Sequence, residues 1–381
     1  MKVKPHTESG LKTWVGLAAL VLAMGLFYFG IPALIAQNPE VYSRYYTTLS
    51  GIALLSMASA GVWLTFYIGR INIGQGVFCL FGAYISGILV VNYGMNFWYS
   101  AIWAGVICSL LSFLIGLPIL RLRGVYFAMV TLISTQVATL VVQNLAITKQ
   151  GRSFALPPPA ALTLPGTDIV VIPAFTLEGA AVGFYFAAIT LMILTFLGLY
   201  RLVNSRIGQL CKSLQQNEEL ASSLGVNIVW LRLVAYAISC FVGGVAGAFY
   251  GAQQANLNVS LFTVQDSVNF LLYCFMGGLN YVVGPLIGTI TLRLGWDQLS
   301  PTGEYQLAIY ALALIILMFI LPNGLMSLVE EGKKWFIRPN HRQKLQSMSA
   351  QKPVKTVAKS AAKKRPKTAA KTAPKSNKGR K

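Results

Sequence analysis

Apolar segments of membrane-spanning length alternate with short polar turns along most of this chain. A helix that crosses the hydrocarbon core needs about 20 predominantly apolar residues. The pattern predicts about ten transmembrane or re-entrant helices, at residues 13–36, 47–68, 74–91, 98–120, 125–147, 180–202, 229–250, 268–278, 282–296 and 306–321. The expected fold class is an all-α polytopic membrane protein. Its membrane body covers residues 13–325, between a short N-terminus (1–12) and a C-terminal tail (326–381).

Two of these segments, 268–278 and 282–296, are short for spans. Two crossings or one re-entrant pair fit them equally well. Either reading keeps an even count, so both termini lie on the same side of the membrane.

The polar run at residues 205–227 has a helical pattern of its own. An apolar face recurs at the 3.6-residue period and consists of Ile207, Leu210, Leu214 and Ala221, with Leu224 beside it. Asn217 and Glu218 interrupt this face, which predicts two short helices with a bend, and Gly225 is a suitable C-terminal stop. Such a hairpin at the membrane surface either presents a face to another protein or serves as a stiff loop that covers neighbouring helix ends.

Charge is scarce in the apolar body and concentrated in the tail. Only 11% of the 381 residues are charged, whereas soluble domains average about 25%. The formal net charge is +20, but residues 333–381 hold 17 Lys and Arg and no Asp or Glu. The remaining 14 basic and 11 acidic residues leave the rest of the chain at +3, so the excess positive charge belongs to the tail.

The last part of that tail, residues 341–381, is rich in Lys, Ala, Pro, Ser and Thr and contains no aromatic residue. Such a segment cannot bury enough apolar area to fold, so we expect it to be disordered. Its expected partner is the anionic lipid of the cytoplasmic surface. Nucleic acid and a solvated topogenic anchor without a partner are the alternatives.

The basic residues between the spans indicate the orientation. With a cytoplasmic N-terminus, the inner segments hold Lys2, Lys4, Lys12, Arg70, Arg121, Arg123, Arg201, Arg206, Lys212 and Arg232. The outer segments hold Arg44, Lys149, Arg152 and Arg293. The excess of ten over four predicts cytoplasmic termini and a cytoplasmic loop at 205–227.

The chain offers little for catalysis or metal binding. None of the five cysteines forms a C-x-x-C pair, and the two histidines, His6 and His341, lie near the termini. We interpret the cysteines as small buried residues. The sequence contains no phosphate-binding G-x-x-x-x-G-K-[ST] loop, so we expect no catalytic residue and no cofactor on this chain.

Glycine spacing indicates how the helices pack. Gly243, Gly247 and Gly251 recur every four residues, and Gly284 and Gly288 repeat that spacing. Small residues at this spacing let helix backbones approach closely in lipid. We expect packing within the subunit rather than a dimer seam.

Several motifs in chain order then point to one family. The residues Glu219, Ala221 and Gly225 match the E-x-A-x-x-x-G core of the EAA loop in permease subunits of ABC importers. Further matches lie at 70–78 (RINIGQGVF), 82–84 (GAY), 121–132 (RLRGVYFAMVTL), 224–227 (LGVN), 243–248 (GGVAGA), 277–279 (GGL), 284–288 (GPLIG) and 321–325 (LPNGL). Together, over residues 51–325, they resemble the LivM-type permeases of branched-chain amino acid importers.

This resemblance implies a permease of the bacterial inner membrane that works with a second permease subunit, two cytoplasmic ATPases that bind the ATP, and a periplasmic substrate-binding protein. The loop at 205–227 would be the coupling helix that docks on the ATPase. The resemblance then assigns ATPase coupling to Leu210, Leu214, Glu219, Ala221 and Gly225. The candidate substrate path comprises Gly74, Gln75, Gly76, Gly277 and Gly278; a broken helix at 74–76 would let the Gln75 amide face a polar path, although a solvated amide at a loop end fits as well.

One stretch departs from the family pattern. Residues 148–154 read TKQGRSF where the family commonly has T-G-G-x-x-G-L. Related permeases are associated with urea, short amides and other small solutes, so these substrates are alternatives to branched-chain amino acids. A passive channel is a further alternative, which would leave the EAA-like loop without a role.

Overall fold

The computed structural model describes residues 42–122, 124–145, 154–156, 159, 162–163, 170–172, 180–223, 225, 227–321 and 324–327. Seven helical segments within them are long and apolar enough to cross a membrane: Tyr45–Tyr67, Gln75–Tyr93, Phe97–Ile119, Val125–Asn144, Val182–Asn204, Ile228–Gln253 and Val259–Gly277. The chain is therefore an all-α polytopic membrane protein, as the hydrophobic pattern predicts. The expected span at 13–36 and the tail beyond residue 327 lie outside the described residues.

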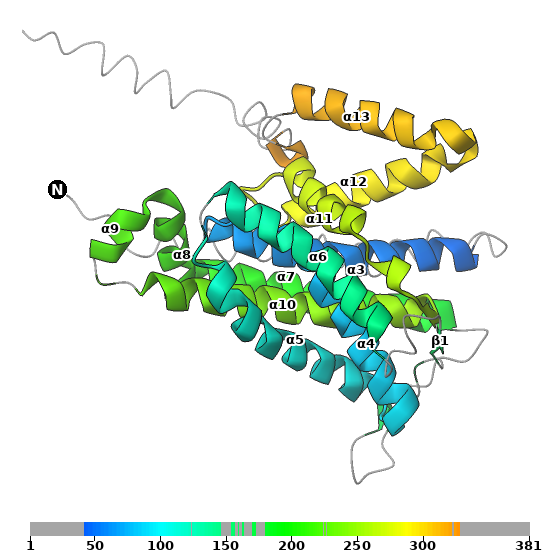
Figure 1. Ribbon diagram of the computed structural model, residues 1–381. Helices are drawn as coiled ribbons and strands as arrows, with labels where there is room; N and C mark the ends of the chain where they lie inside the picture. Colours follow the sequence, from blue (N-terminus) through cyan, green and yellow to red (C-terminus); the bar gives the residue numbers. More distant parts are fainter. Residues whose placement is uncertain are drawn as a thin grey trace, which may run out of the picture. The chain divides into compact units, whose positions relative to one another are not determined.

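The helices follow one another along the chain, and a long connection separates α6 from α7 (Figure 1). The long helices are α3 (Tyr42–Tyr67), α4 (Gln75–Tyr93), α5 (Phe97–Ile119), α6 (Val125–Asn144), α7 (Ala180–Asn204) and α10 (Ile228–Gln253). The shorter helices are α8 (Arg206–Gln216), α9 (Glu218–Ser223), α11 (Val264–Gly277), α12 (Gly284–Leu299) and α13 (Gln306–Ile320), with 3-10 turns η4 (Val259–Leu261) and η5 (Ser300–Tyr305).

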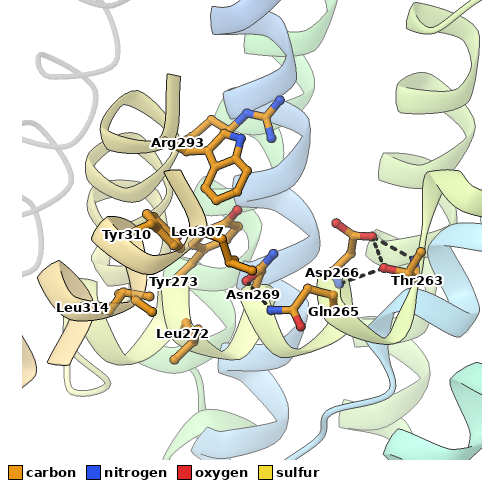
Figure 2. Close-up of a pocket in the computed structure, with 12 residues that line it drawn as sticks. Thr263, Gln265, Asp266, Asn269, Leu272, Tyr273, Arg293, Leu307, Tyr310 and Leu314 are labelled. Atoms are coloured by element: carbon orange, nitrogen blue, oxygen red, sulfur yellow. Dashed lines mark hydrogen bonds between the residues drawn. The ribbon is translucent and has the colours of Figure 1, made fainter. Parts of the chain in front are cut away.

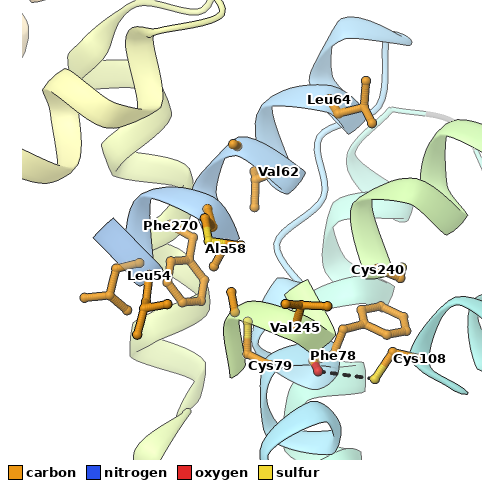
Figure 3. Close-up of a cluster of buried hydrophobic side chains, with 14 of the residues drawn as sticks. Leu54, Ala58, Val62, Leu64, Phe78, Cys79, Cys108, Cys240, Val245 and Phe270 are labelled. Carbon is orange, nitrogen blue, oxygen red and sulfur yellow. Dashed lines mark hydrogen bonds between the residues drawn. The ribbon is translucent and has the colours of Figure 1, made fainter. Parts of the chain in front are cut away.

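Helices α3 and α10 form the centre of the bundle. Helix α10 packs against α3, α4 and α5, and α3 also contacts α7, α11 and α12. In the most apolar stretch of each helix, 89% of the α3 residues are buried, compared with 33% in α5 and 33% in α6. Neighbouring helices cover α3: its Leu54 and Ala58 belong to the same buried cluster as Phe270 of α11 (Figure 3).

Glycines bring α4 and α10 into backbone contact. A side chain at Gly82 would collide with the Gly244 backbone, and one at Gly247 would collide with the Cys79 backbone. The spacing of four residues on α10 therefore serves packing within this subunit, which confirms the prediction. The five cysteines are all free and buried; the Cys108 thiol, for example, donates to the Phe78 carbonyl oxygen at 3.5 Å (Figure 3).

Helices α11 and α12 form a tight antiparallel pair. Gly277 faces the Gly284 backbone, and Gly288 faces the Tyr273 carbonyl group. Helix α11 begins with a capping box, in which Thr263 and Asp266 each bind the other's backbone N–H group. This cap extends the helix several residues before the apolar segment that the sequence predicts at 268–278.

Two small strand pairs accompany the helices. Strand β1 (Phe154–Ala155) pairs antiparallel with β4 (Asn256–Leu257), and β2 (Leu162–Thr163) pairs antiparallel with β3 (Val170–Ile172). The β1–β4 pair ties the long connection before α7 to the C-terminal end of α10.

Candidate functional site

The polar loop between α7 and α10 folds into two short helices, as its pattern predicts. Helix α8 begins after the Ser205 cap, whose hydroxyl oxygen accepts from the Gly208 N–H group at 3.3 Å. Asn217 then leaves the helical conformation, with φ −155° and ψ 108°, and α9 starts at the next residue. Gly225 has φ +79°, a conformation in which a β-branched residue is strained. The bend and the glycine stop are thus confirmed.

The apolar face of this loop is divided between the interior and the solvent. Leu214 (3% exposed) and Ala221 (2% exposed) belong to the buried core, whereas Ile207 and Leu210 are 49% and 40% exposed. Glu219 and Gly225 are exposed as well. The expectation of one shared outward face is therefore wrong for Leu214 and Ala221, because the chain's own helices cover that side of the loop.

Three membrane helices support the loop. Gly208 lies directly against the carbonyl groups of Leu202 and Val203 at the end of α7. The Gln215 amide donates to the Phe66 carbonyl oxygen of α3 at 3.4 Å, and both α8 and α9 contact α10. The loop is thus anchored to the ends of α3, α7 and α10.

An ion pair joins α9 to α10. The Arg232 guanidinium donates two hydrogen bonds to the Glu218 carboxylate, at 3.0 and 2.9 Å. The side chains are 6% and 29% exposed, respectively. Arg232 Nε is buried and has no hydrogen-bond partner among the described residues, so the guanidinium depends on Glu218 for its neutralisation.

Sequence reasoning missed this pair. The prediction used Glu218 only as an interruption of the apolar face and Arg232 only as an inner positive charge. The available signal was an acidic residue at the start of one helix and a lone arginine one turn into the following apolar helix, since a charge inside a membrane helix needs a partner. That signal does not distinguish Glu218 from Glu219; the fold places Glu218 inward and leaves Glu219 exposed.

The inner side of α8 contains a cysteine whose thiol pKa is changed by burial. Cys211 is fully buried, and its burial raises the pKa of the thiol to about 11. The thiol therefore stays neutral at physiological pH and packs as a small apolar group.

A buried polar network surrounds the break between α3 and α4. The Gln75 amide donates to the Ser239 carbonyl oxygen at 3.0 Å, and the Ser239 hydroxyl donates to Gly61 O at 2.8 Å. The Asn72 side-chain oxygen accepts from the Gly74 N–H group at 2.9 Å, and the Gly76 N–H group donates to the Ser267 hydroxyl at 3.2 Å. The network thus links the start of α4 to α3, α10 and α11.

The structure places the residues of the candidate substrate path at two sites, the start of α4 and the turn between α11 and α12. Gln75 is fully buried and its amide is engaged by protein groups, so it is not a solvated loop end. Gly277 and Gly278 lie at the turn between α11 and α12, where Gly278 has φ +110° and Gly324 approaches it closely. Their role in a substrate path stays a prediction. Among the residues that the structure describes, no group of three His, Cys, Asp or Glu could hold a metal ion.

A bundle of apolar spans with a two-helix polar loop braced between three of them defines a multi-pass membrane protein. The chain belongs to the family of branched-chain amino acid transport system permease components, whose pattern matches residues 45–321.

Proteins similar to this chain are named as branched-chain amino acid transport permeases. The chain is 25% identical over 356 residues to the high-affinity branched-chain amino acid transport system permease protein LivM of Escherichia coli K12, covering 87% of this chain and 83% of LivM. It is 27% identical over 285 residues to LivM of Salmonella typhimurium LT2, covering 70% and 66%. It is 25% identical over 287 residues to LivH of E. coli K12, covering 70% and 88%. No solved structure matches the chain.

Proposed function

We propose that this chain is the transmembrane permease subunit of an ABC importer that moves branched-chain amino acids across the bacterial inner membrane. The observation that carries this proposal is the α8–α9 loop in a chain of the permease family. Its outer side offers Ile207 and Leu210 to a partner, and its inner side is fixed to α10 by the Glu218–Arg232 pair. A loop that only covered helix ends would not need an exposed apolar pair.

The proposed topology has about ten spans or re-entrant helices and cytoplasmic termini. In this topology α8 and α9 face the cytoplasm, and the opposite ends of the helices, including the β1–β4 pair, face the periplasm. Helix α12, with 16 residues, is only about 24 Å long and is short for a full crossing. It pairs with α11 through Gly277 and Gly288, an arrangement that suits either two crossings or a re-entrant pair.

The substrate class follows from the names of the relatives and from the charge of the body. LivM and LivH are named for branched-chain amino acids, which favours these substrates over urea or short amides. The body outside the basic tail carries a net charge of only +3. A small zwitterionic solute suits such a path better than a phosphate or a polyamine, since an uncompensated ion in the membrane is costly.

The proposed complex contains this chain, a second permease, two cytoplasmic ATPases and a periplasmic binding protein. ATP would bind to the ATPases, and this chain would hold no cofactor. The second permease is supported by the similarity to both LivM and LivH. The tail would remain at the cytoplasmic surface near anionic lipid.

The proposed mechanism is transmission of ATPase movement to the spans. A rigid ATPase surface that pushes α8 and α9 acts on α10 through Glu218 and Arg232. Because α10 and α4 are in backbone contact, a shift of α10 also moves α4. The bundle would then alternate between openings to the two sides.

The test is co-purification of the ATPase and ATP-driven leucine uptake by the reconstituted complex. Leu210→Asp places a carboxylate in the proposed apolar contact, so attachment of the ATPase should weaken by about tenfold or more. Gln209→Asp introduces the same charge at the neighbouring exposed position and should have a much smaller effect. Normal attachment and uptake by Leu210→Asp would refute the coupling role, and uptake without ATP would indicate a passive channel.

A further inference from the structure

A pocket of about 330 Å³ lies between α11, α12 and α13 (Figure 2). This volume is at the lower end of the range of small-molecule sites, about 300–1,000 Å³. Its walls come from residues 263–273 at the start and middle of α11, from the last turns of α12 and from residues 307–314 of α13. Because three separate segments contribute, the pocket is a feature of the fold rather than of one helix end.

Helix α13 is held in place as one wall of the pocket. The Trp296 and Tyr310 rings make an edge-to-face contact, with centroids 5.0 Å apart and an interplanar angle of 88°. The Gln306 amide donates to the Trp296 carbonyl oxygen at 2.9 Å. These contacts span the η5 turn and fix the spacing between α12 and α13.

The pocket contains one group of each charge. Asp266 lies on the α11 side, where its Oδ2 accepts from the Thr263 N–H group at 2.8 Å and from the Thr263 hydroxyl at 2.7 Å (Figure 2). Arg293 lies on the α12 side. Its Nε is 3.9 Å from Asp297 Oδ1, a contact too long for a hydrogen bond. The forked N–H groups of Arg293 make no hydrogen bond to the described residues, so they are available to a carboxylate.

Polar and apolar walls separate within the pocket. The amides of Gln265 and Asn269 lie next to Asp266 along α11, whereas Leu272, Leu307 and Leu314 line the part between α11 and α13 (Figure 2). Tyr273 of α11 lines the same pocket as Arg293 and Asp266. The two charges thus border the same space as the aliphatic wall.

The pocket lies at the end of the bundle that the α8–α9 loop does not occupy. Strand β4 and η4 lead directly from the C-terminal end of α10 into α11, and β4 pairs with β1 of the long connection before α7. In the proposed topology this end faces the periplasm, where a binding protein releases its solute.

We infer that this pocket is an outer binding site for a zwitterionic α-amino acid with an aliphatic side chain. Arg293 binds the carboxylate through its fork, Asp266 and the neighbouring amides bind the ammonium group, and the leucines contact the side chain. The inference rests on the proposed function and identifies where the imported solute first binds the permease. An alkyl carboxylate or an alkyl amine would satisfy only one of the two charges.

The experiment measures binding of radiolabelled leucine to the complete transporter in nanodiscs, without the binding protein. Wild type should show saturable binding that excess valine displaces and that neither 4-methylpentanoate nor 3-methylbutylamine displaces at equal concentration. Arg293→Gln should weaken binding about 10- to 100-fold, because a charge-assisted pair of hydrogen bonds is lost. Arg293→Lys keeps the charge without the fork and should give an intermediate loss.

Asp266→Asn removes the acidic charge but keeps an oxygen that accepts from Thr263, so helix α11 retains its cap while leucine binding weakens about tenfold or more. Glu304→Gln is the matched control, since Glu304 is exposed in η5 at the same end of the molecule and outside the pocket. Co-purification of the ATPase and basal ATP hydrolysis verify that each variant is assembled.

The outcomes separate this inference from the proposed function. Absence of saturable leucine binding in an assembled wild-type transporter would overturn the inference. Wild-type binding by assembled Arg293→Gln and Asp266→Asn variants would also overturn it, while ATP-driven uptake would still support the permease role. Equal displacement by 4-methylpentanoate would overturn the two-charge recognition. Failure of wild type to assemble with an ATPase would instead count against the proposed function.

Discussion

Replacing Glu218 with Gln removes the carboxylate charge that faces Arg232 and keeps the size of the side chain. The native pair has two charge-assisted hydrogen bonds, at 3.0 and 2.9 Å. The variant retains one neutral acceptor for a guanidinium that is only 6% exposed. We therefore expect α8 and α9 to open from the end of α10 more readily than in wild type.

The magnitude follows from the exposure of the two partners. Breaking a fully buried pair costs about 3–5 kcal/mol, and a hydrogen bond to a charged group contributes about 1.5–3 kcal/mol. Since the Glu218 side chain is 29% exposed, water reaches the pair and the lower range applies. A loss of about 2 kcal/mol corresponds to a rise of about 30-fold in the local opening equilibrium.

Hydrogen–deuterium exchange of the purified transporter measures this opening. Peptides from residues 206–223 should exchange about 30-fold faster in Glu218→Gln, while peptides from the glycine-rich centre of α10 should not change. Glu219→Gln is the matched control, because this neighbouring carboxylate is exposed and forms no salt bridge in the described part of the chain. In the double variant Glu218→Gln/Arg232→Gln, the factor by which exchange accelerates should be smaller than the product of the factors for the two single variants. Equal exchange in Glu218→Gln and the control would refute the reasoning.

Other changes test neighbouring parts of the molecule. Gly225→Val strains a residue at φ +79° by about 1–3 kcal/mol; the protein should reach the membrane but separate ATP hydrolysis from uptake, and wild-type coupling would contradict this. Leu214→Asp puts a carboxylate at a 3% exposed position, so the folded loop should be destabilised by at least about 2–5 kcal/mol. Co-purification of the ATPase should then fall, and normal co-purification would contradict this prediction. Burial raises the pKa of the Cys211 thiol to about 11, so the thiol is neutral up to about pH 10, and the stability of the fold should decline as pH rises above the pKa of the thiol in the unfolded chain. Maleimide should therefore label Cys211 slowly at pH 8, and rapid labelling would show that α8 is open. Deleting residues 351–381 should leave assembly and uptake nearly intact, as measured in vesicles, and complete loss of uptake would contradict that expectation.

The elements of the fold follow closely from hydrophobic pattern and glycine spacing. The predicted span at 229–250 corresponds to α10, Ile228–Gln253, and the bend at Asn217 separates α8 from α9 as expected. These features depend on neighbouring residues in the chain, which periodicity and caps report directly. The start of α11 escaped prediction because its first turn is polar and is held by the Thr263–Asp266 capping box.

The sides of the loop helices could not be predicted in the same way. Periodicity places Leu210 and Leu214 on a common stripe, but it does not say that α7 and α10 cover only part of that stripe. The pocket beside Asp266 and Arg293 depends even more on tertiary structure, since its residues come from three helices and their spacing is set by the η5 turn. Such sites require the packing of distant segments, which a single sequence does not encode locally.

The order of Glu218 and Arg232 along the chain has a consequence for biogenesis. Glu218 precedes Arg232 by 14 residues, so the ribosome releases the acidic partner before the arginine. Arginine raises the cost of inserting a helix, by about 2.5–3.5 kcal/mol at the centre of the bilayer. Because Arg232 lies in the second turn of α10 and its counter-charge has already emerged, nascent α10 can enter the translocon with its positive charge neutralised at the membrane surface.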